Sequence, residues 1–175
     1  MIFANFFILT FYYFLSIFCV LGYGLFIRKL FIDDSIKINY GFTGLIGIFF
    51  LIIYSYISHL FLAHNLIHNS IIFLVGLFCC LFFTKSNFKK KEFQLLLIVF
   101  FILLIALYGF KTHDDFPYYH FPYTNFLTKS DIIIGIGNYD HGWRTPSSIF
   151  YFNSLFYLPL ITHPLFVIFH LILVL

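Results

Sequence analysis

Long apolar runs without charged side chains set the strongest constraint on this chain. Residues 2–27, 41–63 and 93–110 contain no Asp, Glu, Lys or Arg, and a shorter run covers 70–83. A helix needs about 20 apolar residues to cross a bilayer, and lipid removes the need for the polar exterior that a soluble fold requires. The sequence therefore predicts an all-α fold, with four transmembrane helices in residues 1–110 and no soluble domain large enough to fold alone.

Few residues of the chain are charged, and this limits the kinds of molecule that the sequence predicts as binding partners. Charged residues make up 10% of the sequence, whereas soluble domains carry about 25%. The formal net charge of +3 is small and dispersed, so the sequence predicts membrane lipid as a partner and no nucleic acid. The three cysteines lie inside apolar runs, where we expect inert buried thiols rather than a disulfide or metal site: Cys19, Cys79 and Cys80.

The basic residues predict an orientation in the membrane. The polar segments 28–37 and 85–91 hold seven of the ten Lys and Arg residues, whereas the short turn at 64–69 holds none. Positive residues in short loops favour the cytoplasmic side. We therefore expect both basic segments in the cytoplasm and the N-terminus and residues 111–148 outside. The expected location is a bacterial inner membrane, with the long loop facing the periplasm.

The C-terminal part adds two further apolar runs. Residues 149–161 and 164–175 predict two more transmembrane segments after an extracytoplasmic loop at residues 111–148. The last run reaches the end of the sequence without a polar flank. We therefore expect a polytopic bundle of about six apolar segments with the last one truncated, as in the N-terminal fragment of a longer protein or a truncated gene.

The loop at 111–148 holds most of the side chains that could carry chemistry. It contains four of the seven acidic residues and three of the eight histidines. Asp114 and Asp115 could act as a general base, bind a divalent cation together with His113, or simply begin a solvated loop. His120 could be a second ligand or a proton carrier. The spacing matches no closed zinc motif, so a divalent cation is an open option and not a predicted cofactor.

Basic and aromatic side chains in the same loop each have two possible roles. Arg144 could hold a phosphate through its bidentate guanidinium or anchor the chain at the membrane surface, and surface anchoring is the better interpretation for Lys129. The aromatic residues suit an interfacial belt as readily as a platform for stacking sugars. These residues are Tyr118, Tyr119, Tyr123 and Trp143.

Three histidines lie near the expected outer end of the second helix. His59, His64 and His68 are spaced close to the helical period. Metal binding or a proton relay could use such a group. We interpret it instead as the solvated end of a helix, because ionisable residues within the bilayer are rare.

The long loop resembles the first large external loop of the GT-C membrane glycosyltransferases. The similarity rests on an aliphatic helix, the pair Asp114-Asp115, and Tyr119-His120 followed by a proline. Within that group it is most similar to uncharacterised multi-pass bacterial proteins with an Asp…Tyr-His-x-Pro stretch. Their pattern continues into a Gly-x-x-Asn segment, a basic residue and serines, here Gly135 to Asn138, Arg144 and Ser147-Ser148. The resemblance covers residues 103 to about 159.

The resemblance implies an enzyme that transfers a sugar from a polyprenyl-phosphate donor to a glycan or lipid acceptor at the outer membrane face. The catalytic role, as base or metal ligand, then falls on Asp114 or Asp115. Substrate-binding roles fall on Tyr119, His120, Asn138 and Arg144. The chain departs from the family because four helices, rather than one, precede the acidic loop.

A second hypothesis needs no catalysis. The chain could be a non-catalytic membrane subunit, or a fragment of a transporter or polymerase, in a pathway that builds lipid-linked glycans. A transporter commonly carries ionisable or broken segments at mid-membrane. The first four apolar runs carry no charge at their centres, which favours the glycosyltransferase or the subunit over the transporter.

Overall fold

The structure is a computed structural model that describes residues 2–33, 35–85, 89–109, 116–138, 143–144 and 147–158. Within these ranges every element is helical and no strand occurs, so the predicted all-α class is confirmed. The four long helices are α1 (Ile2–Phe31), α2 (Tyr40–His59), α3 (Leu66–Thr84) and α4 (Lys90–Gly109). The short elements are η1 (Phe116–His120), α5 (Phe121–Lys129), η2 (Ile136–Asn138) and α6 (Ser148–Leu155).

The long helices are those of a membrane protein. Among the described residues, three stretches are long and apolar enough to cross a bilayer: Phe7–Phe31, Tyr40–His59 and Leu66–Thr84. The start of α3 differs from expectation. His68 and Asn69 lie inside this helix and not in the preceding turn, because their polar atoms find partners in the fold and need no water.

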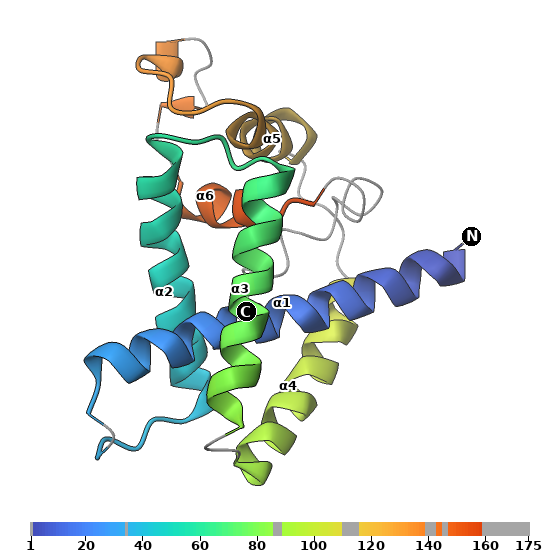
Figure 1. The fold of residues 1–175 in the computed structure, drawn as a ribbon. Coiled ribbons are helices and arrows are strands. Elements are labelled where there is room, and N and C mark those ends of the chain that lie inside the picture. Colours follow the sequence, from blue (N-terminus) through green and yellow to red (C-terminus); the bar gives the residue numbers. More distant parts are fainter. Residues whose placement is uncertain are drawn as a thin grey trace. The chain divides into compact units, whose positions relative to one another are not determined.

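The chain divides into two compact units. The first unit contains Met1–Leu51 and Ile72–Phe110, and the second contains Ile52–Ile71 and Lys111–Leu175. The helices α2 and α3 therefore each contribute one part to each unit. The second unit contains the turn between α2 and α3, together with η1, α5, η2 and α6 (Figure 1).

The first unit is packed through glycines where α1 crosses α2 and α3 (Figure 1). A Cβ atom built on Gly22 would lie 1.9 Å from the carbonyl oxygen of Gly76, and one built on Gly24 would lie 1.9 Å from that of Thr43. A Cβ on Gly47 would lie 2.1 Å from the carbonyl oxygen of Val20. Small residues let helix backbones approach closely in lipid, where van der Waals packing drives association. Glycine is therefore required at these crossings.

Aromatic rings and thiols complete the core of the first unit. Tyr13 is fully buried, and its ring stacks on Phe100 of α4 with the centroids 5.4 Å apart. Tyr23 donates its hydroxyl hydrogen to the carbonyl oxygen of Ile72 over 2.8 Å. Cys19 and Cys80 are free thiols and are buried as predicted, whereas Cys79 is partly exposed.

The expected six-span bundle is not confirmed over the described residues. The apolar run that begins at Ile149 forms α6, which has only eight residues. A helix of that length extends about 12 Å, whereas the hydrocarbon core of a bilayer is about 30 Å thick. Phe156 to Leu158 continue without helix, and residues 159–175, with the expected sixth segment, lie outside the described part. The expected loop at 111–148 contains η1, α5 and η2, so much of it is folded.

Candidate functional site

Helix α5 organises the described part of the expected external loop. Pro122 occupies its first turn, where a proline costs no hydrogen bond and its ring fixes φ near the helical value. Tyr123, Thr124, Leu127 and Thr128 are buried, a spacing that places them on one face of the helix. Tyr123 and Leu127 form a core with Phe150 and Tyr151 of α6. The segment is therefore a packed helical unit and not a solvated loop.

Two of the predicted substrate-binding residues lie at the start of this unit. Tyr119 and His120 are half-buried at the end of η1. Their rings contact Phe150, with centroid distances of 5.2 and 5.1 Å. Tyr119 also lies parallel to Tyr123 at 6.3 Å. Both side chains are thus held in place by α5 and α6, and part of each remains accessible.

The other two predicted substrate-binding residues meet at a tight turn. Gly135 has φ +86°, in the left-handed region that favours glycine, and its carbonyl oxygen accepts the Asn138 backbone N–H over 2.9 Å. Arg144 Nε donates to the carbonyl oxygen of Gly137 over 3.4 Å. A Cβ on Gly137 would lie 3.0 Å from Arg144 Cα, so glycine allows this approach. Asn138 and Arg144 are both exposed.

Two of the aromatic residues expected in a belt or platform, Tyr123 and Trp143, belong to a core instead. Tyr123 is buried, and its ring packs on Trp143 at 5.5 Å. Trp143 also contacts Phe126 at 5.2 Å. Burial raises the pKa of the Tyr123 phenol. Among these four, Tyr118, which is 81% exposed, and the partly exposed Tyr119 still suit a surface role.

The predicted catalytic residues Asp114 and Asp115 lie outside the described residues, as does the candidate metal ligand His113. Their roles therefore stay predictions. Within the described ranges, no group of three or more His, Cys, Asp or Glu side chains is arranged to hold a metal ion. For His59, His64 and His68 this means that three neighbouring imidazoles do not make a metal site.

The interpretation of the histidines as a solvated helix end is wrong for His59 and His64, whereas His68 is partly exposed. His59 and His64 are 1% and 0% exposed. The backbone N–H of His64 donates to the carbonyl oxygen of Leu127 over 3.0 Å, and the backbone N–H of Ile132 donates to that of His59 over 3.1 Å. The α5 segment therefore packs on the turn between α2 and α3 and buries His59 and His64, while Leu60 to Leu62 of the turn stay exposed.

His64 is hydrogen-bonded through both ring nitrogens. Its Nε2 lies 2.9 Å from Ser58 Oγ, and its Nδ1 contacts Ser154 Oγ. The Ser154 hydroxyl also donates to the carbonyl oxygen of Tyr151, and the Ser58 hydroxyl also donates to that of Ser55, so the neutral imidazole donates through one ring nitrogen and accepts through the other. Burial, followed by the neighbouring His68 and His59, lowers the pKa of His64 to about 3. The imidazole is therefore neutral and a weak base.

His68 and Asn69 extend the network. His68 Nε2 lies 3.0 Å from the Tyr54 hydroxyl, and its Nδ1 lies 3.1 Å from Asn69 Oδ1. The His68 ring stacks on His64 with the centroids 5.0 Å apart. Asn69 Nδ2 lies within hydrogen-bond distance of three backbone carbonyl oxygens, which belong to His64 (2.8 Å), Ser154 (2.7 Å) and Tyr157 (3.0 Å), and its two hydrogens are shared among them. Asn69 thus fastens the C-terminal end of α6 to the start of α3.

Sequence reasoning missed Ser58, Asn69 and Ser154 as members of this network. One signal was present, since each is a polar residue within or beside an apolar run. Polar side chains in such runs face protein and pair with one another. The contacts of Ser154 with His64 and Asn69, and of Asn69 with Tyr157, span 85 to 90 residues of the chain, so no local spacing identifies these pairs.

Comparisons with protein-family models, with curated proteins and with solved structures found no match to this chain.

Proposed function

We propose that this chain is a membrane glycosyltransferase-like protein of the GT-C type, which transfers a sugar from a polyprenyl-phosphate donor to a glycan or lipid acceptor at the outer membrane face. One observation carries the proposal. The segment with Tyr119, His120, Asn138 and Arg144 packs on the His59 end of α2, whereas the basic residues next to α2 precede its other end at Tyr40.

The length of α2 supports an external location for this segment. From Tyr40 to His59 the helix has 20 residues and extends about 30 Å, which equals the hydrocarbon thickness of a bilayer. Basic loops favour the cytoplasm, so the end of α2 at His59 would face the periplasm. A lipid-linked donor at that surface keeps its polyprenyl tail in the bilayer while its phosphate and sugar reach the polar residues.

The proposed chemistry is a substitution at the anomeric carbon of the sugar. Asp114 or Asp115 accepts the proton of the acceptor hydroxyl, the hydroxyl oxygen bonds to the anomeric carbon, and the bond from that carbon to the donor phosphate breaks. The leaving polyprenyl phosphate takes the electron pair. Arg144, exposed beside Gly137, or a divalent cation stabilises the developing negative charge. Tyr119, His120 and Asn138 bind polar groups of the two substrates.

The test is sugar transfer in membrane vesicles that contain the full chain. Labelled sugars on polyprenyl phosphate are supplied, and transfer to lipid or glycan acceptors is measured. We expect Asp114→Asn or Asp115→Asn to abolish transfer and Arg144→Gln to reduce it by roughly 100-fold, the cost of losing one donor to a developing charge. Asp131→Asn is the matched control, because Asp131 is an exposed residue of the same segment. No transfer by the unaltered chain, or full activity of both aspartate variants, would contradict the proposal.

A separate labelling experiment tests the orientation. In a variant without native cysteines, Tyr118→Cys places a thiol at a position that is 81% exposed, and Lys37→Cys places one at an exposed site in the basic loop before α2. We expect an impermeant maleimide added to intact spheroplasts to label only the first. Labelling of the second alone would reverse the orientation and remove the transferase proposal.

The second candidate function, a non-catalytic membrane subunit, is favoured by the buried network. The polar side chains of Ser58, His64 and Asn69 hold the fold together and leave no group of the network poised for chemistry. The two proposals separate in cells. A subunit would need the second unit intact but would tolerate the change of both aspartates to asparagine.

A further inference from the structure

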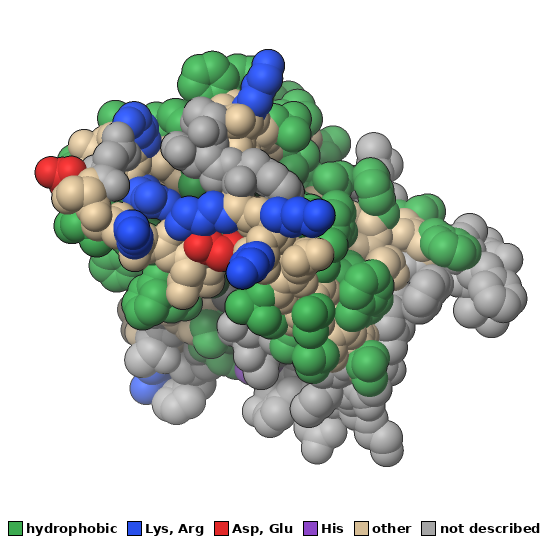
Figure 2. Space-filling view, turned by 90° about the horizontal axis from the view of Figure 1, so that it is seen from below, with side chains coloured by type: hydrophobic (Ala, Val, Ile, Leu, Met, Phe, Trp, Pro, Cys, Tyr) green, Lys and Arg blue, Asp and Glu red, His purple; other side chains and the backbone are tan. Residues whose placement is uncertain are grey.

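Basic side chains of the first unit gather on one face, seen from below in Figure 2. They come from the last turn of α1 and the segment that follows it, and from the segment between α3 and α4 and the first turn of α4. We call this surface the basic platform. Its members are Arg28, Lys29, Lys37, Lys85, Lys89, Lys90 and Lys91.

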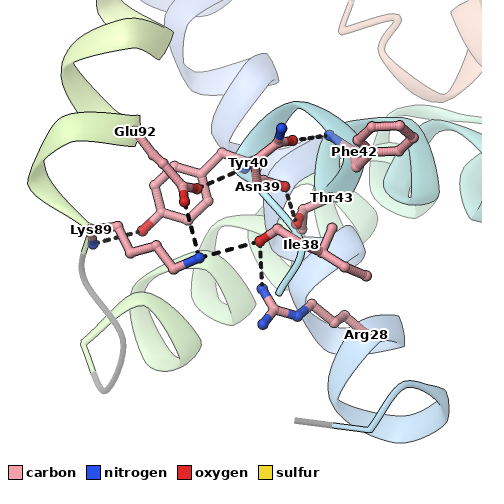
Figure 3. A network of polar contacts seen from close by, with 8 residues as sticks. All are labelled: Arg28, Ile38, Asn39, Tyr40, Phe42, Thr43, Lys89 and Glu92. Atoms are coloured by element: carbon pink, nitrogen blue, oxygen red, sulfur yellow. Dashed lines mark hydrogen bonds and ion pairs between the residues drawn. The ribbon is translucent and has the colours of Figure 1, made fainter. Parts of the chain in front are cut away.

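Part of the platform is a clamp that joins its two segments (Figure 3). Lys89 Nζ donates to the carbonyl oxygen of Ile38 over 3.3 Å and pairs with Glu92 over 3.0 Å. The other oxygen of Glu92 accepts the backbone N–H of Tyr40 over 3.0 Å. Arg28 Nη1 also donates to the carbonyl oxygen of Ile38, over 3.4 Å. The clamp therefore fixes both segments and uses the Glu92 carboxylate within itself.

Four lysines of the platform have no acidic partner among the residues that the structure describes. They are Lys37, Lys85, Lys90 and Lys91, and all four are exposed. The Glu92 charge is already neutralised by Lys89, and Asp33 is the one further described carboxylate in these segments, so positive charge is in excess. Four ammonium groups held near one another by a fixed scaffold create a positive potential that attracts anions.

Apolar side chains beside these lysines identify the kind of anion. Leu30, Phe31 and Ile36 are 58%, 78% and 53% exposed in the segment that also carries Lys37. Exposed apolar residues interleaved with lysines are typical of segments that lie in the interface of a bilayer. A soluble anion would give these three side chains no partner, whereas the upper acyl chains of a lipid would cover them.

We infer that the basic platform binds anionic phospholipids of the leaflet on its side of the membrane. The lysine ammonium groups contact headgroup phosphates, and Leu30, Phe31 and Ile36 insert beside the first methylenes of the acyl chains. The clamp holds the two segments at one spacing, so the site exists before lipid arrives. This inference is independent of the proposed sugar transfer, because it uses only residues of the first unit.

The test uses the full chain in phosphatidylcholine bilayers with traces of spin-labelled lipid. The motionally restricted fraction of spin-labelled phosphatidylglycerol is compared with that of spin-labelled phosphatidylcholine, and the ratio gives the preference for the anionic headgroup. Each surface lysine is worth about 1 kcal/mol toward anionic lipid, or about fivefold. We expect Lys90→Gln with Lys91→Gln to reduce the association constant at the site by roughly 25-fold, and 0.5 M salt to reduce the preference of the unaltered chain.

The matched control is Lys111→Gln, which makes the same chemical change as Lys90→Gln but outside the platform. It should leave the preference unchanged, whereas Lys90→Gln alone should lower it about fivefold. Equal association of both lipids with the unaltered chain, or equal losses in these two single variants, would overturn the inference. Displacement of the spin-labelled lipid by millimolar inorganic phosphate would also overturn it, because the site would then recognise a free anion and not a lipid.

Discussion

The two units solve the same problem, burial of helical surface, by opposite means. In the first unit, α1 approaches α2 and α3 at Gly22, Gly24 and Gly47, and backbone lies against backbone. In the second unit, Ser58, His64 and Asn69 fill the space between the α2–α3 turn and α6 with hydrogen bonds. The first unit therefore depends on glycines, which have no side chain at the crossings. The second unit depends on hydrogen bonds from particular polar side chains.

The difference follows from what each unit must bury. The crossing helices of the first unit satisfy their own backbone groups, so close approach and dispersion suffice. The second unit contains the α2–α3 turn and the ends of short helices. The backbone carbonyl groups at these places have no partner within a helix. Each buried carbonyl without a donor would cost about 1 to 3 kcal/mol. Asn69 supplies donors to three of them.

The largest expected effect tests the glycine crossings of the first unit. Gly22→Leu places a side chain against the carbonyl oxygen of Gly76, a backbone atom that cannot rotate away. We expect a loss of about 3 kcal/mol or more in the free energy of unfolding, measured by thermal or denaturant unfolding in detergent. Gly44→Leu is the matched control, because a Cβ on Gly44 meets no atom within 4 Å. If both variants unfold alike, the first unit does not depend on these crossings.

The next effect concerns the amide in the second unit. Asn69→Ala removes the donors to the carbonyl oxygens of His64, Ser154 and Tyr157, and we expect a cost of about 2 to 3 kcal/mol. Hydrogen exchange should rise in α5 and α6, while the centres of α1 and α4 keep their protection. Asn125→Ala on the partly exposed face of α5 should change little. A rise spread evenly over both units would show that their stabilities are not separate.

Acidification should weaken the second unit alone. The pKa of His64 is lowered from 6.5 to about 3. As the pH falls, His64 therefore takes up a proton in the unfolded unit at a higher pH than in the folded unit. Stability is therefore complete above pH 6.5 and falls as the pH drops from 6.5 toward 3, by about 2 kcal/mol at pH 5. Hydrogen exchange in α5, corrected for its intrinsic pH dependence, measures the loss. His64→Gln should flatten the profile. An unchanged slope in that variant would assign the pH dependence to another group.

The smallest effects should be equal in the two units. Asn39 Oδ1 accepts the backbone N–H of Phe42 at the start of α2 over 2.8 Å, and Asn65 Oδ1 accepts that of His68 at the start of α3 over 3.0 Å. Replacing either cap with alanine should cost about 1 kcal/mol. Unfolding of the two variants in the same detergent gives the comparison. A much larger cost at Asn65 would mean that the cap also holds His68 in its place.

Hydropathy predicted the long helices because crossing a bilayer is a local property of the sequence. The bounds of α1, α2 and α4 differ from the apolar runs by only a few residues. The start of α3 was placed too late, because His68 and Asn69 are typical of turns unless distant groups satisfy them. Helix α5 was missed because Pro122 reads as a turn signal, although proline fits the first turn of a helix.

The candidate site was predictable only in part. Tyr119, His120 and Arg144 were candidates by residue type and Asn138 by resemblance alone, and the structure adds that Arg144 contacts the glycine turn next to Asn138. Their binding of substrate stays a prediction. The hydrogen-bond network of His64 and Asn69 could not be predicted from the sequence. Its partners at Leu127 and Ser154 are brought near by tertiary contacts and not by sequence spacing.

The hydrogen bonds between Asn69 and the C-terminal end of α6 have a consequence for biosynthesis. Tyr157, the last carbonyl that Asn69 holds, follows it by 88 residues, and a ribosome needs roughly 4 to 18 seconds to add that length. During this interval His64 and Asn69 at the α2–α3 turn have been synthesised. The later segment with α6, which buries them, has not. The nascent hairpin must therefore keep this turn hydrated, or covered by an insertion factor, until the later segment is synthesised.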